Sequence, residues 1–239
     1  MKSRLMRVVA TGALALALAA GAQAGPFADF EAELRAVYAP YRNALFATNQ
    51  KNAANSEKTV EAFARGWAKL ADKWRSAPPP QYVDDPRFAE TMDRIDALVA
   101  GARKQIAAGD FGEAHEALEK IRNELGALRQ RNQVRSYSDL MNEYHVAMEH
   151  MTSQKAESGP AALAVLRDRA AVLVFLAEKL ASAQPPEAKD RPDFAELTRA
   201  VVASAKALHA AAAAGDPAAV QAALGALKKP YAMLFVNFG

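Results

Sequence analysis

Residues 79–93 read PPQYVDDPRFAETMD, and residues 185–197 read PPEAKDRPDFAEL. Laid over each other without gaps, the stretches 79–128 and 185–234 share 15 of 50 residues. The matches include Pro, Phe and Gly-Asp positions, which a chain merely rich in Ala would not produce. They pair Pro79 with Pro185, Pro80 with Pro186, Asp84 with Asp190, Pro86 with Pro192, Phe88 with Phe194 and Gly109-Asp110 with Gly215-Asp216. The sequence therefore predicts one structural unit that occurs twice.

Each copy carries the start and stop signals of a helical hairpin. Pro86 and Pro192 suit a first helical turn, where the N–H that proline lacks has no partner in any case. Gly109 and Gly215 can take the left-handed conformation that ends a helix, and the Asp after each can cap the next helix. The repeated stretch thus predicts two helices joined by a tight turn in each half.

The rest of the chain is helical by the same criteria. Ala, Leu, Glu, Lys and Arg dominate, and apolar residues recur at intervals of three and four. Two expected core stripes are Phe30, Leu34, Tyr38, Tyr41 and Leu45, and Val60, Phe63, Trp67, Leu70 and Trp74. The expected helices are 27–47, 56–75, 86–108, 110–131, 136–151, 160–181, 192–214 and 217–238, with a cap at Asn55 or Ser56 and a kink or restart at Pro230.

These helices predict an all-α chain with two tandem antiparallel four-helix bundles, because short links favour antiparallel neighbours. The first would span residues 25–133 and the second 134–239. The pattern does not decide between two separate bundles and one fused body.

The first 24 residues read as a secretory signal peptide. Lys2, Arg4 and Arg7 precede an apolar run over residues 8–20, and Ala22-Gln23-Ala24 fits a small-x-small cleavage site. Cleavage would leave Gly25 as the first residue of a periplasmic protein with no membrane span. An uncleaved anchor is the alternative, although the apolar run is short for one.

Composition excludes several functional classes. Lys and Arg number 30 against 27 Asp and Glu, and the excess of three equals the positive charges of the signal peptide. The mature chain is then near neutral, which argues against nucleic acid as a partner. The chain has no Cys, so it lacks disulfides, lipoprotein attachment and covalent haem.

Each repeat contains, in order, Pro-Pro, Asp-x-Pro, an Ala-rich helix that ends in Gly and an Ala-Leu helix. In both repeats this order resembles the second half of cytochrome b562. The resemblance implies a periplasmic four-helix bundle holding non-covalent haem b between a Met of the first helix and a His of the fourth. In the second half the Met position corresponds to Met148 and the His position to Phe235. In the first half the positions correspond to Leu45 and Arg129. The second half lacks the ligand His and the first half lacks both ligands.

A concentration of possible metal ligands lies in residues 141–151, MNEYHVAMEHM. Met141, Tyr144, Met148 and Met151 share one helix face, with His145 beside them and Glu149 one turn later. Thioether and imidazole donors favour copper, so the predicted metal ligands are Met141, His145, Met148, Glu149, His150 and Met151. The alternative is that the Met stripe is core, that His145 pairs with Glu149 and that His150 faces solvent.

The remaining residues are weaker candidates for a functional site. His115, one turn before Glu119, is expected to form an exposed ion pair, and His209 lies beside an apolar stripe. No di-iron, zinc-protease, hydrolase or phosphate-loop motif is present, so no catalytic residue is predicted. Three hypotheses follow: a haem-free protein binding copper or a periplasmic protein partner through the second half, a b-type cytochrome with His145 or His209 as replacement ligand, and a chaperone-like interaction module.

Overall fold

The computed structural model describes residues 25–153 and 160–239, and every regular element in these ranges is a helix. The predicted all-α class is confirmed. The predicted signal peptide, residues 1–24, lies outside the described residues. The α-helices are α1 (Pro26–Asn49), α2 (Ala53–Trp74), α3 (Phe88–Ala107), α4 (Phe111–Arg131), α5 (Tyr137–Ser153), α6 (Pro160–Ser182), α7 (Asp193–Ala214), α8 (Pro217–Ala226) and α9 (Lys228–Phe238), with 3-10 turns η1 (Pro80–Tyr82) and η2 (Pro186–Ala188).

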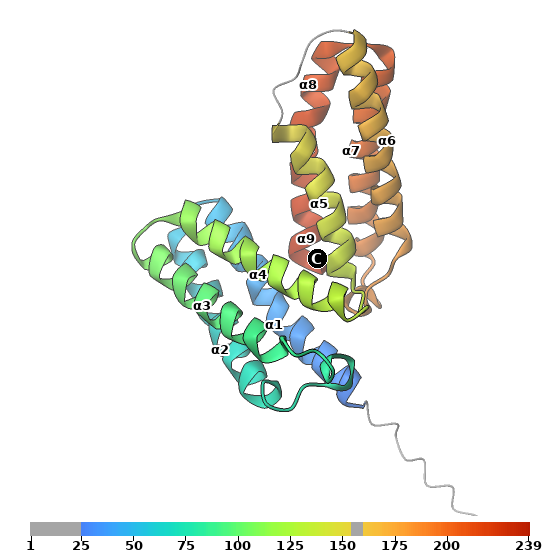
Figure 1. Ribbon diagram of the computed structural model, residues 1–239. Helices are drawn as coiled ribbons and strands as arrows, with labels where there is room; N and C mark the ends of the chain where they lie inside the picture. The colour runs from blue at the N-terminus through green and yellow to red at the C-terminus, as the bar shows by residue number, and fades with distance from the viewer. Residues whose placement is uncertain (1–24, 154–159) are drawn as a thin grey trace, which may run out of the picture.

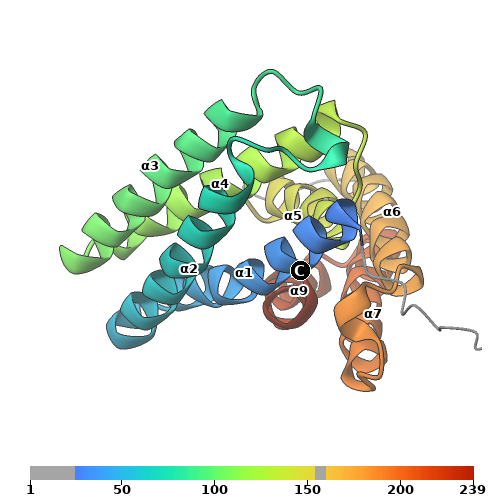
Figure 2. The same cartoon turned by 90° about the horizontal axis from the view of Figure 1, so that it is seen from below.

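The helices gather into two groups, which we call the first unit (α1–α4) and the second unit (α5–α9) (Figure 1). In the first unit each helix packs on the next, and α4 returns to α1. In the second unit α8 and α9 together follow α7 and return to α5. The two units are set at a steep angle, with α5 and α9 standing against α1 and α4 (Figures 1 and 2).

The repeated stretch takes the same local structure in both units. The 3-10 turns η1 and η2 occupy matching positions, and Gly109 and Gly215 both have positive φ, at 77° and 69°. Asp110 Oδ1 accepts a hydrogen bond from Glu113 N at 3.2 Å, and Asp216 Oδ1 accepts one from Ala218 N at 2.9 Å. The predicted glycine ends and Asp caps are therefore confirmed.

Burial also repeats at matching positions. Both expected aromatic stripes of α1 and α2 are buried. Matching residues of α3 and α7 are buried as well, in the pairs Phe88/Phe194, Met92/Thr198, Ile95/Val201, Val99/Ala205, Ala102/Leu208 and Ile106/Ala212. The two units therefore bury different side chains at matching helix positions.

Three local expectations need adjustment. Pro86 was expected in the first turn of its helix, but α3 begins at Phe88 after an N-cap at Arg87, so Pro86 precedes it. α2 begins at Ala53, and its cap is Asn52, whose Oδ1 accepts from Asn55 N at 3.1 Å. Ser56 is buried inside the helix, so the cap predicted at Asn55 or Ser56 was wrong. The break expected at Pro230 occurs just before it, because α8 ends at Ala226 and Pro230 lies in the first turn of α9, where its missing N–H has no intrahelical partner.

The two units are joined by a continuous core. Buried residues of all the described α-helices belong to one hydrophobic cluster. Arg129 at the end of α4 makes a two-pronged contact with Asp139 of α5, with Nε and Nη2 at 2.9 and 2.6 Å from Oδ1. Arg42 of α1 donates to the carbonyls of Val236 and Gly239 at 3.2 and 2.6 Å. These buried cations tie the ends of α4 and α9 to the neighbouring unit.

Candidate functional site

A cleft of about 330 Å³ opens where the two units meet, and we call it the inter-unit cleft. Its lining comes from α1, α4, α5 and α9, so neither unit forms it alone. The residues that line it are Leu45, Phe46, Asn49, His115, Glu119, Arg122, His145, Met148, Glu149, Lys228, Tyr231, Ala232 and Phe235.

Glu119 of α4 is the centre of the polar part of this cleft. Its Oε1 lies 3.2 Å from Arg122 Nη2, 3.7 Å from His115 Nε2 and 3.6 Å from His145 Nε2. His145 belongs to α5, so the carboxylate faces imidazoles from both units. The contact with His145 is the largest cause that lowers the pKa of Glu119, to about 2, and Arg122 and His115 add to it while burial opposes it.

The orientation of His115 follows from its neighbours. The Thr48 hydroxyl lies 2.9 Å from the carbonyl oxygen of Ala44 and donates its hydrogen there. His115 Nδ1, 3.1 Å from that hydroxyl, must then carry the proton and donate it to Thr48 Oγ1. Burial lowers the pKa of His115, although Glu119 and the carbonyl of Leu45 oppose this, so the imidazole is neutral near pH 7. Its Nε2 therefore presents a lone pair toward the Glu119 carboxylate.

His145 lies on the opposite side of the cleft. Its ring stacks on Tyr231 of α9 with centroids 5.3 Å apart. Its side chain is 17% exposed, and the buried Nδ1 atom has no hydrogen-bond partner among the residues that the structure describes. A second unpaired atom nearby is Arg122 Nε. The cleft thus contains two buried nitrogen atoms without a hydrogen-bond partner among the described residues.

The structure separates the six predicted metal ligands. Met141, Met148 and Met151 are all buried, and Met148 lines the cleft while the other two lie in the core of the second unit. Glu149 is 3.0 Å from Lys228 Nζ rather than paired with His145. His150 is exposed on α5. Of the predicted set, His145 and Met148 face the cleft together, with Glu149 at its edge.

The residues that sequence reasoning missed come mostly from the other unit. His115 was expected to be an exposed ion-pair residue with Glu119; it does contact Glu119, but its side chain is half-buried and lines the inter-unit cleft. Glu119, Arg122 and Tyr231 were not predicted as site residues. Within α4 the spacing of His115, Glu119 and Arg122 places them on one face, but nothing in a single helix indicates that this face meets His145.

The positions that correspond to haem ligands hold other groups. Arg129 is ion-paired with Asp139 and 4% exposed, and Phe235 is 7% exposed beside Tyr231. Leu45 is buried at the wall of the cleft. An ion-paired guanidinium and a hydrocarbon ring cannot ligate iron, so the matched positions do not fit an axially ligated haem.

Residues 25–153 and 160–239 lack two kinds of structural feature. In these ranges no group of three or more His, Cys, Asp or Glu side chains stands in an arrangement that could hold a metal ion. In the same ranges no helix is long and apolar enough to cross a membrane.

Comparisons of the chain with protein-family models, with curated proteins and with solved structures found no match. The resemblance to cytochrome b562 therefore remains a prediction. The function must be inferred from the geometry of the inter-unit cleft.

Proposed function

We propose that this protein is a periplasmic, non-enzymatic and haem-free helical-bundle protein that binds a transition metal, with copper(I) favoured, in the inter-unit cleft. The ligands are His145 and Met148 of the second unit and His115 of the first. The scaffold is a pair of tandem antiparallel four-helix bundles that resemble cytochrome b562.

The observation that supports this proposal is the arrangement of His115 against Glu119. A neutral Nε2 lone pair faces a carboxylate oxygen 3.7 Å away, and His145 Nε2 lies 3.6 Å from the same oxygen. The His115 lone pair and the Glu119 carboxylate are both acceptors and repel each other unless a cation or a proton lies between them. His145, in contrast, lowers the pKa of Glu119 by a hydrogen bond to the carboxylate. The hydrogen bond from His115 Nδ1 to Thr48 is the outer contact that fixes the ring of a metal-bound histidine.

The donor types favour copper(I) over harder ions. Thioether sulfur selects soft copper(I), and imidazole binds copper well. Hard cations and zinc would require several carboxylates or further histidines, and the described residues offer no such cluster. Glu119 is already neutralised by Arg122 at 3.2 Å, so a monovalent ion suits the local charge better than a divalent one.

The other parts of the proposal rest on the sequence. The leader-like residues 1–24 support export, and the absence of Cys excludes a thiolate site. Chain entry into the periplasm is tested by comparing the mass of the protein recovered from that compartment with the full-length chain. Cleavage after Ala24 is the expected result, and recovery of intact protein in the cytoplasm would contradict export.

The metal proposal is tested by competition for copper(I) with a coloured chelator such as bicinchoninate. We expect one copper(I) per chain, with affinity reduced at least about tenfold in His115→Gln, His145→Gln and Met148→Leu, because each removes one donor. Matched controls are His209→Gln and Met151→Leu, which alter a histidine and a buried methionine that do not line the cleft. Unchanged binding in His115→Gln would exclude a site shared by the two units.

Haem is examined on the same purified protein. The proposal predicts no Soret shift when haem is titrated, because Arg129 and Phe235 occupy the matched ligand positions. A shifted Soret band that His145→Gln abolishes would favour the b-type cytochrome instead.

A further inference from the structure

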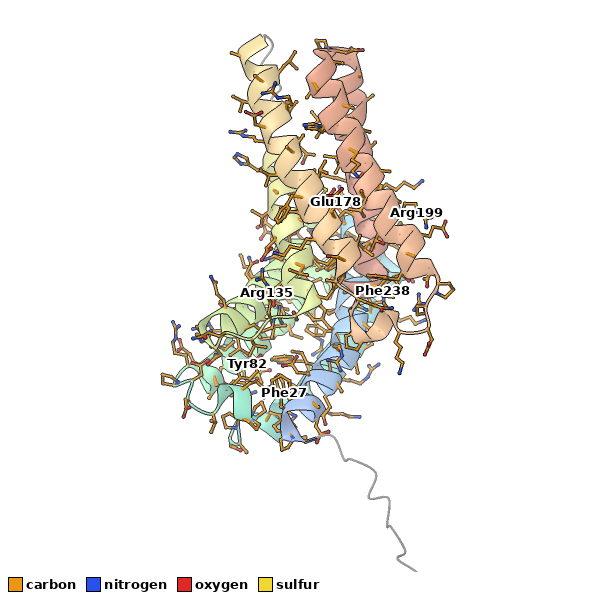
Figure 3. All side chains as sticks on the ribbon, turned by 90° about the vertical axis from the view of Figure 1, so that its right-hand side faces the viewer. Phe27, Tyr82, Arg135, Glu178, Arg199 and Phe238 are labelled. Atoms are coloured by element: carbon orange, nitrogen blue, oxygen red, sulfur yellow. The ribbon has the colours of Figure 1, made fainter. Side chains whose placement is uncertain are left out.

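Helix α6 presents large apolar side chains to solvent. Val165, Val172 and Phe175 are 51%, 55% and 63% exposed. Its inner face is also apolar, with Ala170, Leu173, Ala177 and Leu180 buried. A helix that is apolar on both faces is normally covered on both. In this structure α5 and α7 cover the inner face only, and α6 lies at the outer edge of the second unit (Figures 1 and 3).

The outer face has a charge at each end of its apolar centre. Val172 lies four residues after Asp168, Phe175 lies three residues after Val172, and Lys179 lies four residues after Phe175. Spacings of four, three and four keep all of them on one side of a helix. The side chain of Asp168 is 71% exposed and that of Lys179 is 31% exposed. The face is therefore negative, apolar and positive in order along the helix.

We propose that this face binds a second copy of the chain, with the two α6 helices antiparallel across a two-fold axis. Reversal of the order sets Asp168 of each copy opposite Lys179 of the other, and Val172 opposite Phe175. A two-fold contact must be self-complementary in this way. Both charges of the face then find an opposite charge, and its apolar centre is covered.

The present partners of these charges do not prevent the contact. Asp168 accepts from its neighbour Arg167 at 2.9 Å, and Lys179 donates to Glu143 at 2.7 Å. Ion pairs at the surface each contribute about 0–1 kcal/mol, so the exposed Asp168 pair and the half-buried Lys179 pair can both be shared at little cost. Burial of Val172 and Phe175 provides the driving force, and the charges set the register.

The test uses two charge-reversed variants of the whole mature chain, Asp168→Lys and Lys179→Asp, in sedimentation equilibrium without added metal. Each variant alone would face like charges across the axis, and we expect its dimer to dissociate about tenfold more readily than wild type. In an equimolar mixture, the face of Asp168→Lys is positive at both ends and the face of Lys179→Asp is negative at both ends. Opposite charges then meet at both ends of the contact, so the mixture should dimerise as wild type does.

The result that overturns the proposal is a wild-type chain that stays monomeric at 100 μM, on the order of the weakest affinity of a specific contact. Dimerisation unaffected in both variants, or a mixture no better than its components, would also overturn it. Phe175→Ser serves as a further variant and should weaken the dimer without changing the far-ultraviolet circular dichroism. The measurement is made on metal-free protein, so it is independent of the copper proposal.

Discussion

The first unit packs its core with aromatic rings at positions where the second unit packs small side chains. In α2 the buried residues Val60, Phe63, Trp67 and Leu70 follow the same spacing as Ala170, Leu173, Ala177 and Leu180 in α6. Tyr82 of η1 likewise corresponds to Ala188 of η2, and both are buried. At these positions the two units therefore bury side chains of different size.

The two units also fasten the repeated turn differently. In the first unit Asp85 accepts from Arg131 and Asn132 at the end of α4, at 2.7 and 2.9 Å. At the matching positions of the second unit Arg191 donates to Asn237 of α9 at 3.3 Å. The contact is kept, but its only charged group in the second unit is Arg191, because Asn237 is neutral. The contact in the first turn therefore depends on an ionised carboxylate, whereas the corresponding contact in the second turn contains no carboxylate.

The largest effect expected from the comparison concerns Trp67 of α2 and Ala177, which has the same place in the buried stripe of α6. Trp67→Ala should lower the free energy of unfolding by about 4 kcal/mol, because it empties a buried site and removes the bond from Trp67 Nε1 to Asp96 at 2.7 Å. Ala177→Gly should cost only about 1 kcal/mol, through helix propensity. Urea unfolding followed by circular dichroism measures both, and equal losses would refute the difference in packing.

The next effect concerns the joint between the units. Asp139→Asn should destabilise the chain by about 3 kcal/mol, because Arg129 is 4% exposed and would keep its charge without a carboxylate. Asp139 also accepts from the backbone N of Ser136 at 2.8 Å, which stabilises the start of α5. Glu90→Gln is the control, since its pair with Arg94 is exposed. A loss no greater than that of the control would show that this joint contributes little.

The smallest effect is a pH dependence of the turn contact made by Asp85 in the first unit. Burial alone would raise the pKa of Asp85, but hydrogen bonds from Asn132, the Arg87 backbone N–H and Arg131 outweigh it and lower the pKa. Because the folded pKa lies below the ordinary value of 3.8, Asp85 stabilises the fold above that pH and loses this contribution as the pH falls further. Asp85→Asn should therefore flatten the acid dependence of stability below about pH 4.

Tryptophan fluorescence is suited to this measurement. Both tryptophans, Trp67 and Trp74, lie in α2 of the first unit. Acid titration by fluorescence should differ between wild type and Asp85→Asn, whereas Arg191→Gln in the second unit should leave the fluorescence curve unchanged. The same curve for wild type and Asp85→Asn would contradict the assignment.

Much of the fold could be predicted because its signals are local. Gly109 and Asp110 act within one turn, and the stripes of α1 and α2 reflect helical period alone. The break between α8 and α9 at Leu227 could be expected from Pro230, which lies in the first turn of α9. The cap of α2 was missed because Asn52, Asn55 and Ser56 are all suitable capping residues and tertiary packing selected Asn52 by burying Ser56.

Only about half of the residues of the candidate site could be predicted from the sequence. His145 and Met148 were found because they are close in sequence, whereas His115 and Glu119 reach the cleft through the angle between the two units. That angle depends on contacts such as Arg42 with the end of α9 and Arg129 with Asp139, which join residues far apart in sequence or on different helices. Helical periodicity cannot indicate which outer face of α4 meets α5, so His115 was read as exposed.

The central claim is that copper(I) is held by donors from both units. X-ray absorption at the copper edge of the protein loaded with one copper(I) tests it most directly. We predict two imidazole nitrogens and one sulfur in the coordination shell, with the sulfur lost in Met148→Leu and one imidazole lost in His115→Gln. A shell of oxygen alone, or one that neither substitution changes, would contradict the account.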